Sequence, residues 1–175
     1  QKMIEHPSIR LMLSKNFIAG EENSYDHIFY TGPIDAYFQY CFGRLGYRTV
    51  DFKKQYAEGD YQGATQVNYC DEQVPYTRIV EHKHFTPWEQ HPNTVYFVEY
   101  SRETTNGDIP YYPKRLEADK QLLKRYRQAA EQEPNTSFLG RLATYRYMDM
   151  QHVIEEAIHF AHHFAANLPS GQRPI

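Results

Sequence analysis

The sequence predicts an α+β fold with a mainly antiparallel sheet and two or three flanking helices. Between Tyr47 and Tyr100, strand-like segments follow one another with only turn-sized gaps, and this spacing favours antiparallel pairing. After Arg115, two longer segments repeat apolar residues at helical spacing instead. A sheet-forming middle followed by helices is typical of α+β proteins rather than of alternating α/β proteins.

The first elements expected along the chain are short. Residues 9–13 alternate apolar and polar side chains, which predicts a strand. Residues 27–30 predict a second strand, which a Gly-Pro pair soon ends. Residues 34–42 predict a short helix that ends near the following glycines.

Four strands are expected in the middle of the chain, because each segment is bounded by Gly, Pro or Asn. They are Tyr47–Tyr56, Thr65–Tyr69, Thr77–Lys83 and Thr94–Tyr100. A helix from about Arg115 to Gln132 follows and ends before a proline. A short strand at 136–139 then runs into Gly140, and Asp149 is the expected N-cap of a last helix. That helix carries an apolar stripe made of Val153, Ile154, Ala157, Ile158, Ala161 and Phe164.

Composition excludes several classes of protein. The 175 residues are 41% hydrophobic and 23% charged, and the mean hydropathy of -0.77 predicts no membrane-spanning segment. A formal net charge of -3 lacks the basic excess that nucleic-acid-binding proteins usually carry. Two cysteines, Cys41 and Cys70, imply no disulfide framework, and no signal peptide opens the chain. We therefore expect a reducing, cytoplasmic setting.

Arg78 is the first candidate for chemistry, in the stretch PYTRIVEHKHF. A strand would place Tyr76, Arg78, Val80 and His82 on one face. An arginine beside a tyrosine in mid-strand could bind a phosphate with two parallel hydrogen bonds. It could equally form a cross-strand salt bridge to an acidic residue, and the stretch alone favours that reading slightly.

Histidines recur twice at metal-ligand spacing. His82 and His84 stand two residues apart, but no cysteine or second spaced histidine pair accompanies them. A second group lies near the end of the last helix and comprises His159, His162 and His163. This spacing fits a solvated helix face, where the partial positive charge of the histidines suits the helix C-terminus. We therefore expect no metal site.

Two further stretches present hydrogen-bond donors. FLGRLATYRYMDM joins a strand, a Gly140–Arg141 turn and a helix start, where free backbone N–H groups can bind anions. An ordinary strand–helix connection would look the same. In PYYP, Tyr111 and Tyr112 stand between two prolines, which stiffen the backbone. The stretch could be a rigid loop that presents both tyrosine hydroxyls, or simply a packed turn. No dinucleotide-binding glycine motif or P-loop occurs, so the residues alone predict an α+β domain that binds a phosphorylated ligand.

Six ordered motifs make the sequence resemble the bacterial UDP-galactopyranose mutase family of flavoenzymes. They are YTGPID, FGRLGYRT, PYTRIVEHKHF, EYSRE, PYYP and GRLATYRYMDM. The resemblance implies interconversion of UDP-galactopyranose and UDP-galactofuranose by ring contraction through a reduced-flavin N5–sugar adduct. It further implies FAD as cofactor, a role in galactofuranose-containing cell-wall and lipopolysaccharide glycans, and a homodimer without nucleic-acid or membrane partners.

The resemblance also assigns roles to residues. Arg78 is expected to be catalytic and to bind the substrate diphosphate, together with Tyr112 and Tyr147, and Asn68 is expected on the substrate side. The cofactor-binding residues that it implies are Arg141, Asp149, Met150, Gly140, Thr31 and Gly32.

The resemblance covers only the C-terminal half of the proteins in this family. The resemblance implies a sheet-rich substrate-binding part at about 36–113 and a flavin-facing strand–turn–helix at about 134–168. Members of the family begin with an FAD-binding βαβ unit, and this sequence does not contain it. We therefore expect the chain alone to be inactive. A non-catalytic nucleotide-sugar-binding module and another flavoprotein of related architecture are the alternative interpretations.

Overall fold

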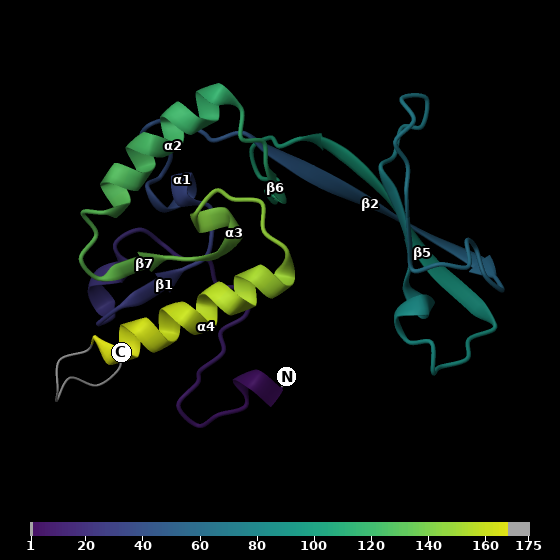
Figure 1. The fold of residues 1–175 in the computed structure, drawn as a ribbon, viewed down its shortest axis with the longest axis horizontal. Helices are drawn as coiled ribbons and strands as arrows, with labels where there is room; N and C mark the ends of the chain where they lie inside the picture. Colours follow the sequence, from purple (N-terminus) through teal and green to yellow (C-terminus); the bar gives the residue numbers. More distant parts are fainter. Residues whose placement is uncertain (1, 168–175) are drawn as a thin grey trace.

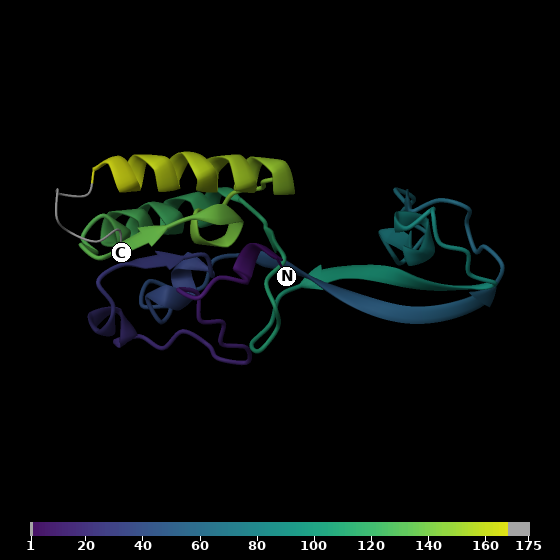
Figure 2. The same cartoon turned by 90° about the horizontal axis from the view of Figure 1, so that it is seen from below.

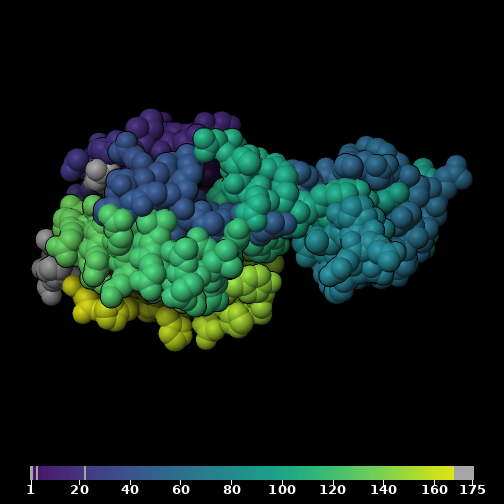
Figure 3. Space-filling model, turned by 90° about the horizontal axis from the view of Figure 1, so that it is seen from above, coloured from purple at the N-terminus to yellow at the C-terminus, as the bar shows by residue number. Residues whose placement is uncertain are grey.

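The computed structural model describes residues 2–167 and forms two bodies joined by a long ribbon (Figure 1). The larger body holds the α-helices and a two-stranded sheet, whereas the ribbon ends in a smaller body (Figure 2). We call the smaller body, built around residues 59–92, the distal lobe. The space-filling view shows a narrow waist between the two bodies (Figure 3).

The larger sheet is antiparallel throughout, as the sequence predicts, with the order β3-β4-β5-β2-β6. Its long strands β2 (Tyr47–Glu58) and β5 (Asn93–Glu103) form the ribbon. The strand β4 (Arg78–Glu81) lies beside β5, β3 (Gln66–Asn68) lies beside β4 at the edge, and β6 (Tyr112–Pro113) lies beside β2.

A second sheet pairs β1 (Ile28–Tyr30) with β7 (Thr136–Phe138) in parallel. Two long helices, α2 (Glu117–Ala130) and α4 (Met150–Ala166), accompany it, with the short helices α1 (Ile34–Tyr37) and α3 (Gly140–Ala143). Short 3₁₀ helices occur at η1 (Lys2–Ile4), η2 (Glu21–Ser24) and η3 (His82–Phe85). The mixed architecture confirms the predicted fold class.

The core of the larger body is rich in tyrosine. It comprises Ile34, Leu45, Tyr47, Leu123, Tyr126 and Tyr145. The hydroxyls of Tyr126 and Tyr145 donate to the carbonyls of Gly43 and Gly46, and these bonds tie α2 and the segment after α3 to the loop before β2. A hydroxyl buried with its acceptor lets an aromatic ring fill the core without leaving a polar atom unpaired.

Several expected elements differ in the structure. Residues 9–13 form no strand, and Leu13 is 78% exposed, because alternation yields a strand only where a neighbouring strand supplies hydrogen bonds. Helix α1 stops at Tyr37, since Gln39 and Tyr40 take left-handed backbone angles. Strand β4 stops at Glu81, and the next four residues coil into η3 instead of continuing the expected strand.

Candidate active site

Strand register places Asn68, Arg78 and Glu99 in one row across the larger sheet. Asn68 pairs with Arg78 across β3 and β4, and Arg78 pairs with Glu99 across β4 and β5. Directly paired residues share a sheet face, so all three side chains lie on the same face. The chain therefore brings together two of the residues predicted for substrate binding and a carboxylate that the prediction did not include.

Arg78 is held in this row by Glu99. Its Nε and Nη2 atoms both donate to Glu99 Oε2, at 2.8 and 2.6 Å, and the Glu99 side chain is only 7% exposed. Hydrogen bonds from Arg78 to Glu99 and to Tyr112 raise the pKa of Arg78. The cross-strand salt bridge that the sequence left open is thus present, and the Nη1 atom of Arg78 donates a long hydrogen bond to Gln66 Oε1 at 3.4 Å.

Tyr112 extends the row toward the larger body. It lies on β6, paired with Arg48 of β2, and its ring stacks on Tyr147 with 6.2 Å between the centroids. The guanidinium carbon of Arg141 lies 5.3 Å from the centroid of the Tyr112 ring. Two arginines and two tyrosines from β4, β6, α3 and the loop before α4 thus form one connected cluster of hydrogen-bond donors.

The predicted cofactor residues meet at one end of the parallel sheet. Thr31 and Gly32 follow β1, Gly140 and Arg141 follow β7, and the strands are aligned so that Tyr30 pairs with Phe138. The carboxyl ends of parallel strands are where open α/β sheets bind ligands. Gly140 has a φ of +75°, and a Cβ at Gly32 would lie 2.6 Å from the Tyr30 hydroxyl, so both turns require glycine.

A cavity of about 840 Å³ opens beside this sheet end. It is lined by Thr31, Gly32, Asp35 and Tyr47, with the loop 104–110 on its other side. The Tyr47 hydroxyl is buried there without a hydrogen-bond partner, and burial raises the pKa of Tyr47. An unpaired buried hydroxyl beside a cavity of this size is typical of a ligand pocket.

Asp149 and Met150 stand apart from the other predicted cofactor residues. Asp149 is the N-cap of α4, as expected, and both side chains are exposed, Met150 to 78%. Neither residue lines the cavity, and of the predicted cofactor residues only Thr31 and Gly32 do. Their predicted role therefore depends on backbone groups at the start of α4 rather than on side-chain contacts.

Sequence reasoning missed Glu99 and Tyr47. The stretch EYSRE contained the signal for Glu99, because an acidic residue one strand away from Arg78 can pair with it once the register is known. Tyr47 gave no signal, since a buried tyrosine and a ligand-facing tyrosine look alike in a sequence.

Comparison with known proteins identifies relatives for nearly the whole chain. Residues 1–147 match the family model described as UDP-galactopyranose mutase. The chain is 48% identical over 168 residues to a probable UDP-galactopyranose mutase of Klebsiella pneumoniae, covering 96% of this chain and 44% of that protein. It is also 48% identical over 174 residues to a dTDP-fucopyranose mutase of Escherichia coli, covering 95% of this chain and 46% of that protein.

A solved structure agrees in fold. The crystal structure of a reduced UDP-galactopyranose mutase matches with a TM-score of 0.53 at 12% identity, over 70% of this chain and 37% of that chain. This chain thus spans less than half the length of the curated relatives described above. Within residues 2–167, no helix has the length and apolar character needed to cross a membrane.

Proposed function

The chain belongs to the UDP-galactopyranose mutase family, and from this membership we propose that it forms the substrate-binding portion of an enzyme that interconverts UDP-galactopyranose and UDP-galactofuranose. The observation that carries the proposal is the connected cluster of Arg78, Tyr112, Tyr147 and Arg141. We assign residues 36–113 to substrate binding and residues 134–168, whose last residue lies outside the described range, to the cofactor side.

The donors suit a leaving diphosphate. When the bond between the anomeric carbon and the diphosphate breaks, negative charge grows on the phosphate oxygens, and preorganised donors stabilise it. The Nη1–Nη2 edge of Arg78 offers two parallel N–H groups, because Glu99 occupies the Nε side. The hydroxyls of Tyr112 and Tyr147 add neutral donors, and Asn68 lies next to Arg78 for contact with the substrate.

The residues at the sheet end fit part of an FAD molecule. Thr31, Gly32 and Gly140 offer backbone groups without bulky side chains, Arg141 offers charge for the pyrophosphate, and the start of α4 at Asp149 and Met150 offers free N–H groups. The unpaired Tyr47 hydroxyl and the adjoining cavity support a ligand there. Reduced FAD, when bound, supplies the nucleophile for the anomeric carbon.

The wider setting follows from the family. We propose a cytoplasmic enzyme that provides galactofuranose for cell-surface glycans and assembles as a homodimer. Two exposed free cysteines, Cys41 and Cys70, are consistent with a reducing compartment.

dTDP-fucopyranose is the second candidate substrate, because the Escherichia coli relative is as similar as the Klebsiella one. Both substrates share a nucleoside diphosphate, so the Arg78 cluster serves either of them. They differ in the base, in the 2′-hydroxyl of the nucleoside and in the 6-hydroxyl of the transferred sugar.

A chimera tests the proposal. The amino-terminal part of the Klebsiella relative is joined to this chain and loaded with FAD, reduced with dithionite, and assayed with UDP-galactofuranose and dTDP-fucofuranose. We expect turnover of UDP-galactofuranose. Turnover of the dTDP sugar alone would reassign the substrate, and a folded, flavin-loaded chimera that converts neither sugar would overturn the proposal.

A further inference from the structure

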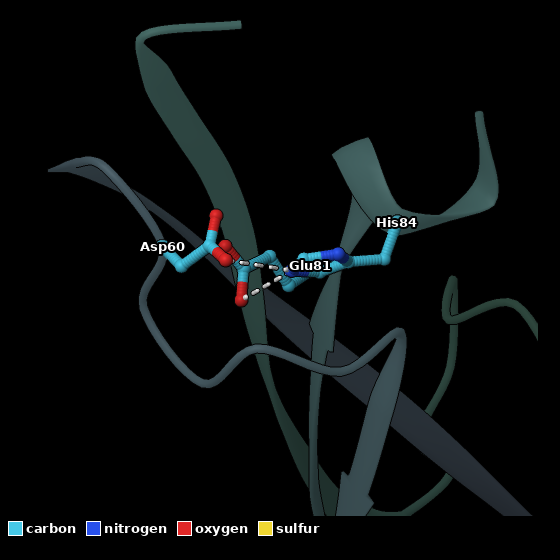
Figure 4. Close-up of side chains that lie close together, drawn as sticks. All are labelled: Asp60, Glu81 and His84. Carbon is cyan, nitrogen blue, oxygen red and sulfur yellow. Dashed lines mark ion pairs between the residues drawn. The ribbon is translucent and has the colours of Figure 1, made fainter. Parts of the chain in front are cut away.

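Three potential metal ligands converge in the distal lobe, and none of them belongs to the candidate active site (Figure 4). Asp60 lies in the loop after β2, Glu81 ends β4, and His84 lies on η3. One donor atom from each lies within 4.8 Å of the other two. Glu81 is three residues from Arg78 along a strand, so its side chain lies on the opposite sheet face.

We propose that Asp60, Glu81 and His84 bind one divalent transition-metal cation, for which Zn²⁺ is the best match. His84 Nε2 and one oxygen from each carboxylate would supply three ligands, and water would supply the fourth. Three protein ligands of nitrogen and oxygen type with one open position form a recognised class of zinc site.

The separations between donor atoms suit a shared ion. His84 Nε2 lies 3.4 Å from Glu81 Oε2 and 3.9 Å from Asp60 Oδ2. Two ligands about 2.1 Å from a tetrahedral zinc ion stand about 3.4 Å apart. The His84–Glu81 pair therefore already has this spacing, and the His84–Asp60 pair, in which Asp60 is exposed on a loop, is about half an ångström wider.

The histidine nitrogen lacks any other partner. His84 Nε2 is buried and makes no hydrogen bond, although the side chain as a whole is 23% exposed. A buried nitrogen without a partner costs free energy unless something binds it. It points between two carboxylates, as Figure 4 shows, and a cation there would satisfy all three groups.

Glu81 is oriented before any ion arrives. Its side chain is fully buried, and its two oxygens accept hydrogen bonds from the backbone N–H groups of Tyr61 and Gln62 at 3.0 and 2.9 Å. Burial alone would raise the pKa of Glu81, but these bonds hold it down to about 2, so the carboxylate is charged at neutral pH. Such outer hydrogen bonds position metal-binding carboxylates in known sites.

Lys83 orients Asp60, the third proposed ligand. Its ammonium group pairs with Asp60 Oδ1 and donates to the carbonyls of Gly59 and His91, at 2.9 and 3.4 Å. The other oxygen, Oδ2, is left facing His84. With one lysine and two carboxylates, the neighbourhood carries one net negative charge, and the imidazole favours zinc over magnesium or calcium.

The consequence would be structural rather than catalytic. The ion would add a further link between the loop after β2, the end of β4 and η3, which the hydrogen bonds of Glu81 and Lys83 already join. An ion that binds only the folded lobe stabilises it by mass action.

The test is a zinc titration of the 175-residue chain, followed by competition with a chromophoric chelator and by Co²⁺ absorption. All proteins carry His163→Gln, because the exposed residues His159 and His163, at i, i+4 spacing on α4, could otherwise bind zinc as a pair.

The variants Asp60→Asn and His84→Gln each remove one proposed ligand, and His91→Gln is the matched control in the same lobe. Circular dichroism checks folding, and Asp60→Asn, at an exposed position, keeps the test valid if His84→Gln does not fold.

We expect one Zn²⁺ per chain, with affinity reduced at least about tenfold in both ligand variants and unchanged in the control. Bound Co²⁺ should show visible absorption that the ligand variants lose. Zinc binding of parental strength in either folded ligand variant would overturn the proposal, and so would failure of the parent chain to bind zinc or an equal loss in His91→Gln.

Discussion

Arg78 directs both Nε and Nη2 at a single oxygen of Glu99, across the pairing of β4 with β5. This contact ties the proposed diphosphate-binding arginine to a buried carboxylate on the neighbouring strand. Removing either partner therefore has two effects, one on the fold and one on the chemistry, and the predictions must separate them.

Arg78→Ala in the chimera should lower kcat by about 10²–10³, because a charged donor that acts on the leaving diphosphate is lost. Arg78→Lys should not restore kcat fully, since a point charge cannot replace two parallel N–H groups. Steady-state kinetics with dithionite-reduced protein measure both variants. Near-normal kcat in a well-folded Arg78→Ala protein would remove Arg78 from the site.

The double variant Arg78→Ala/Glu99→Gln separates stability from turnover. Arg78→Ala alone leaves the Glu99 carboxylate buried and unpaired, which should lower the melting temperature. Neutralising Glu99 should recover most of that loss, while kcat stays low. Thermal unfolding and kinetics are compared in the same preparations. If the double variant regains turnover along with stability, Arg78 serves only as the structural partner of Glu99.

The isolated chain should not retain FAD. The residues at the sheet end contact part of a dinucleotide, and no glycine-rich phosphate loop at a helix N-terminus exists in this sequence to anchor the pyrophosphate. Gel filtration after purification in saturating FAD measures the flavin-to-protein ratio. A yellow protein with one flavin per chain would contradict the prediction.

Gly46→Ala should destabilise the chain by about 1–3 kcal/mol, the usual cost of overpacking. A Cβ at Gly46 would lie 2.9 Å from Asp119 Oδ1, and the Gly46 backbone cannot retreat because its N–H and C=O are bound by Asp119 and Tyr145. Gly63→Ala is the control, with positive φ but open space around the added carbon. Urea unfolding should show the larger loss at Gly46, and equal losses would contradict the packing argument.

Acid should loosen the distal lobe through Glu81. The pKa of this carboxyl is lowered to about 2 in the fold, so its stabilising contribution is present above its ordinary pKa near 4.5 and is lost as the pH falls from there toward 2. Glu81→Gln should flatten the pH dependence of unfolding across that window. Exposed Glu58→Gln should not. Parallel acid titrations of Glu81→Gln and the parent chain would contradict the prediction.

The apolar stripe on α4 should make the isolated chain self-associate. Phe160 and Phe164 pack on Phe29 of β1, but Ile154 and Ile158 remain 53% and 52% exposed. Replacing both isoleucines with lysine should shift sedimentation toward monomer without unfolding the helix. A parent chain that is cleanly monomeric at high concentration would contradict this expectation.

Local patterns predicted four of the five strands of the larger sheet and both long helices, because alternation and helical spacing act over a few residues. They missed β6, whose two residues lie in PYYP, a stretch that predicts a loop or a turn. They did not predict pairing partners. The contact of Arg78 with Glu99 depends on register between strands about twenty residues apart, and the convergence of Asp60 on His84 depends on a loop path. Residues 9–13 alternate apolar and polar side chains as a strand does, but they form no strand because no neighbouring strand pairs with them.

The parallel pair of β1 and β7 also bears on the order in which the chain can fold. His27 contacts Ser137, 110 positions further along the chain, whereas the paired residues of β2 and β5 are only 35 positions (Glu58 with Asn93) to 55 positions (Arg48 with Glu103) apart. Closing a long loop costs more entropy than closing a short one, so distant contacts form late. During synthesis on the ribosome, the ribbon and distal lobe are complete before β7 has been made. Strand β1 can therefore pair with β7 only after the ribbon and the distal lobe have been made.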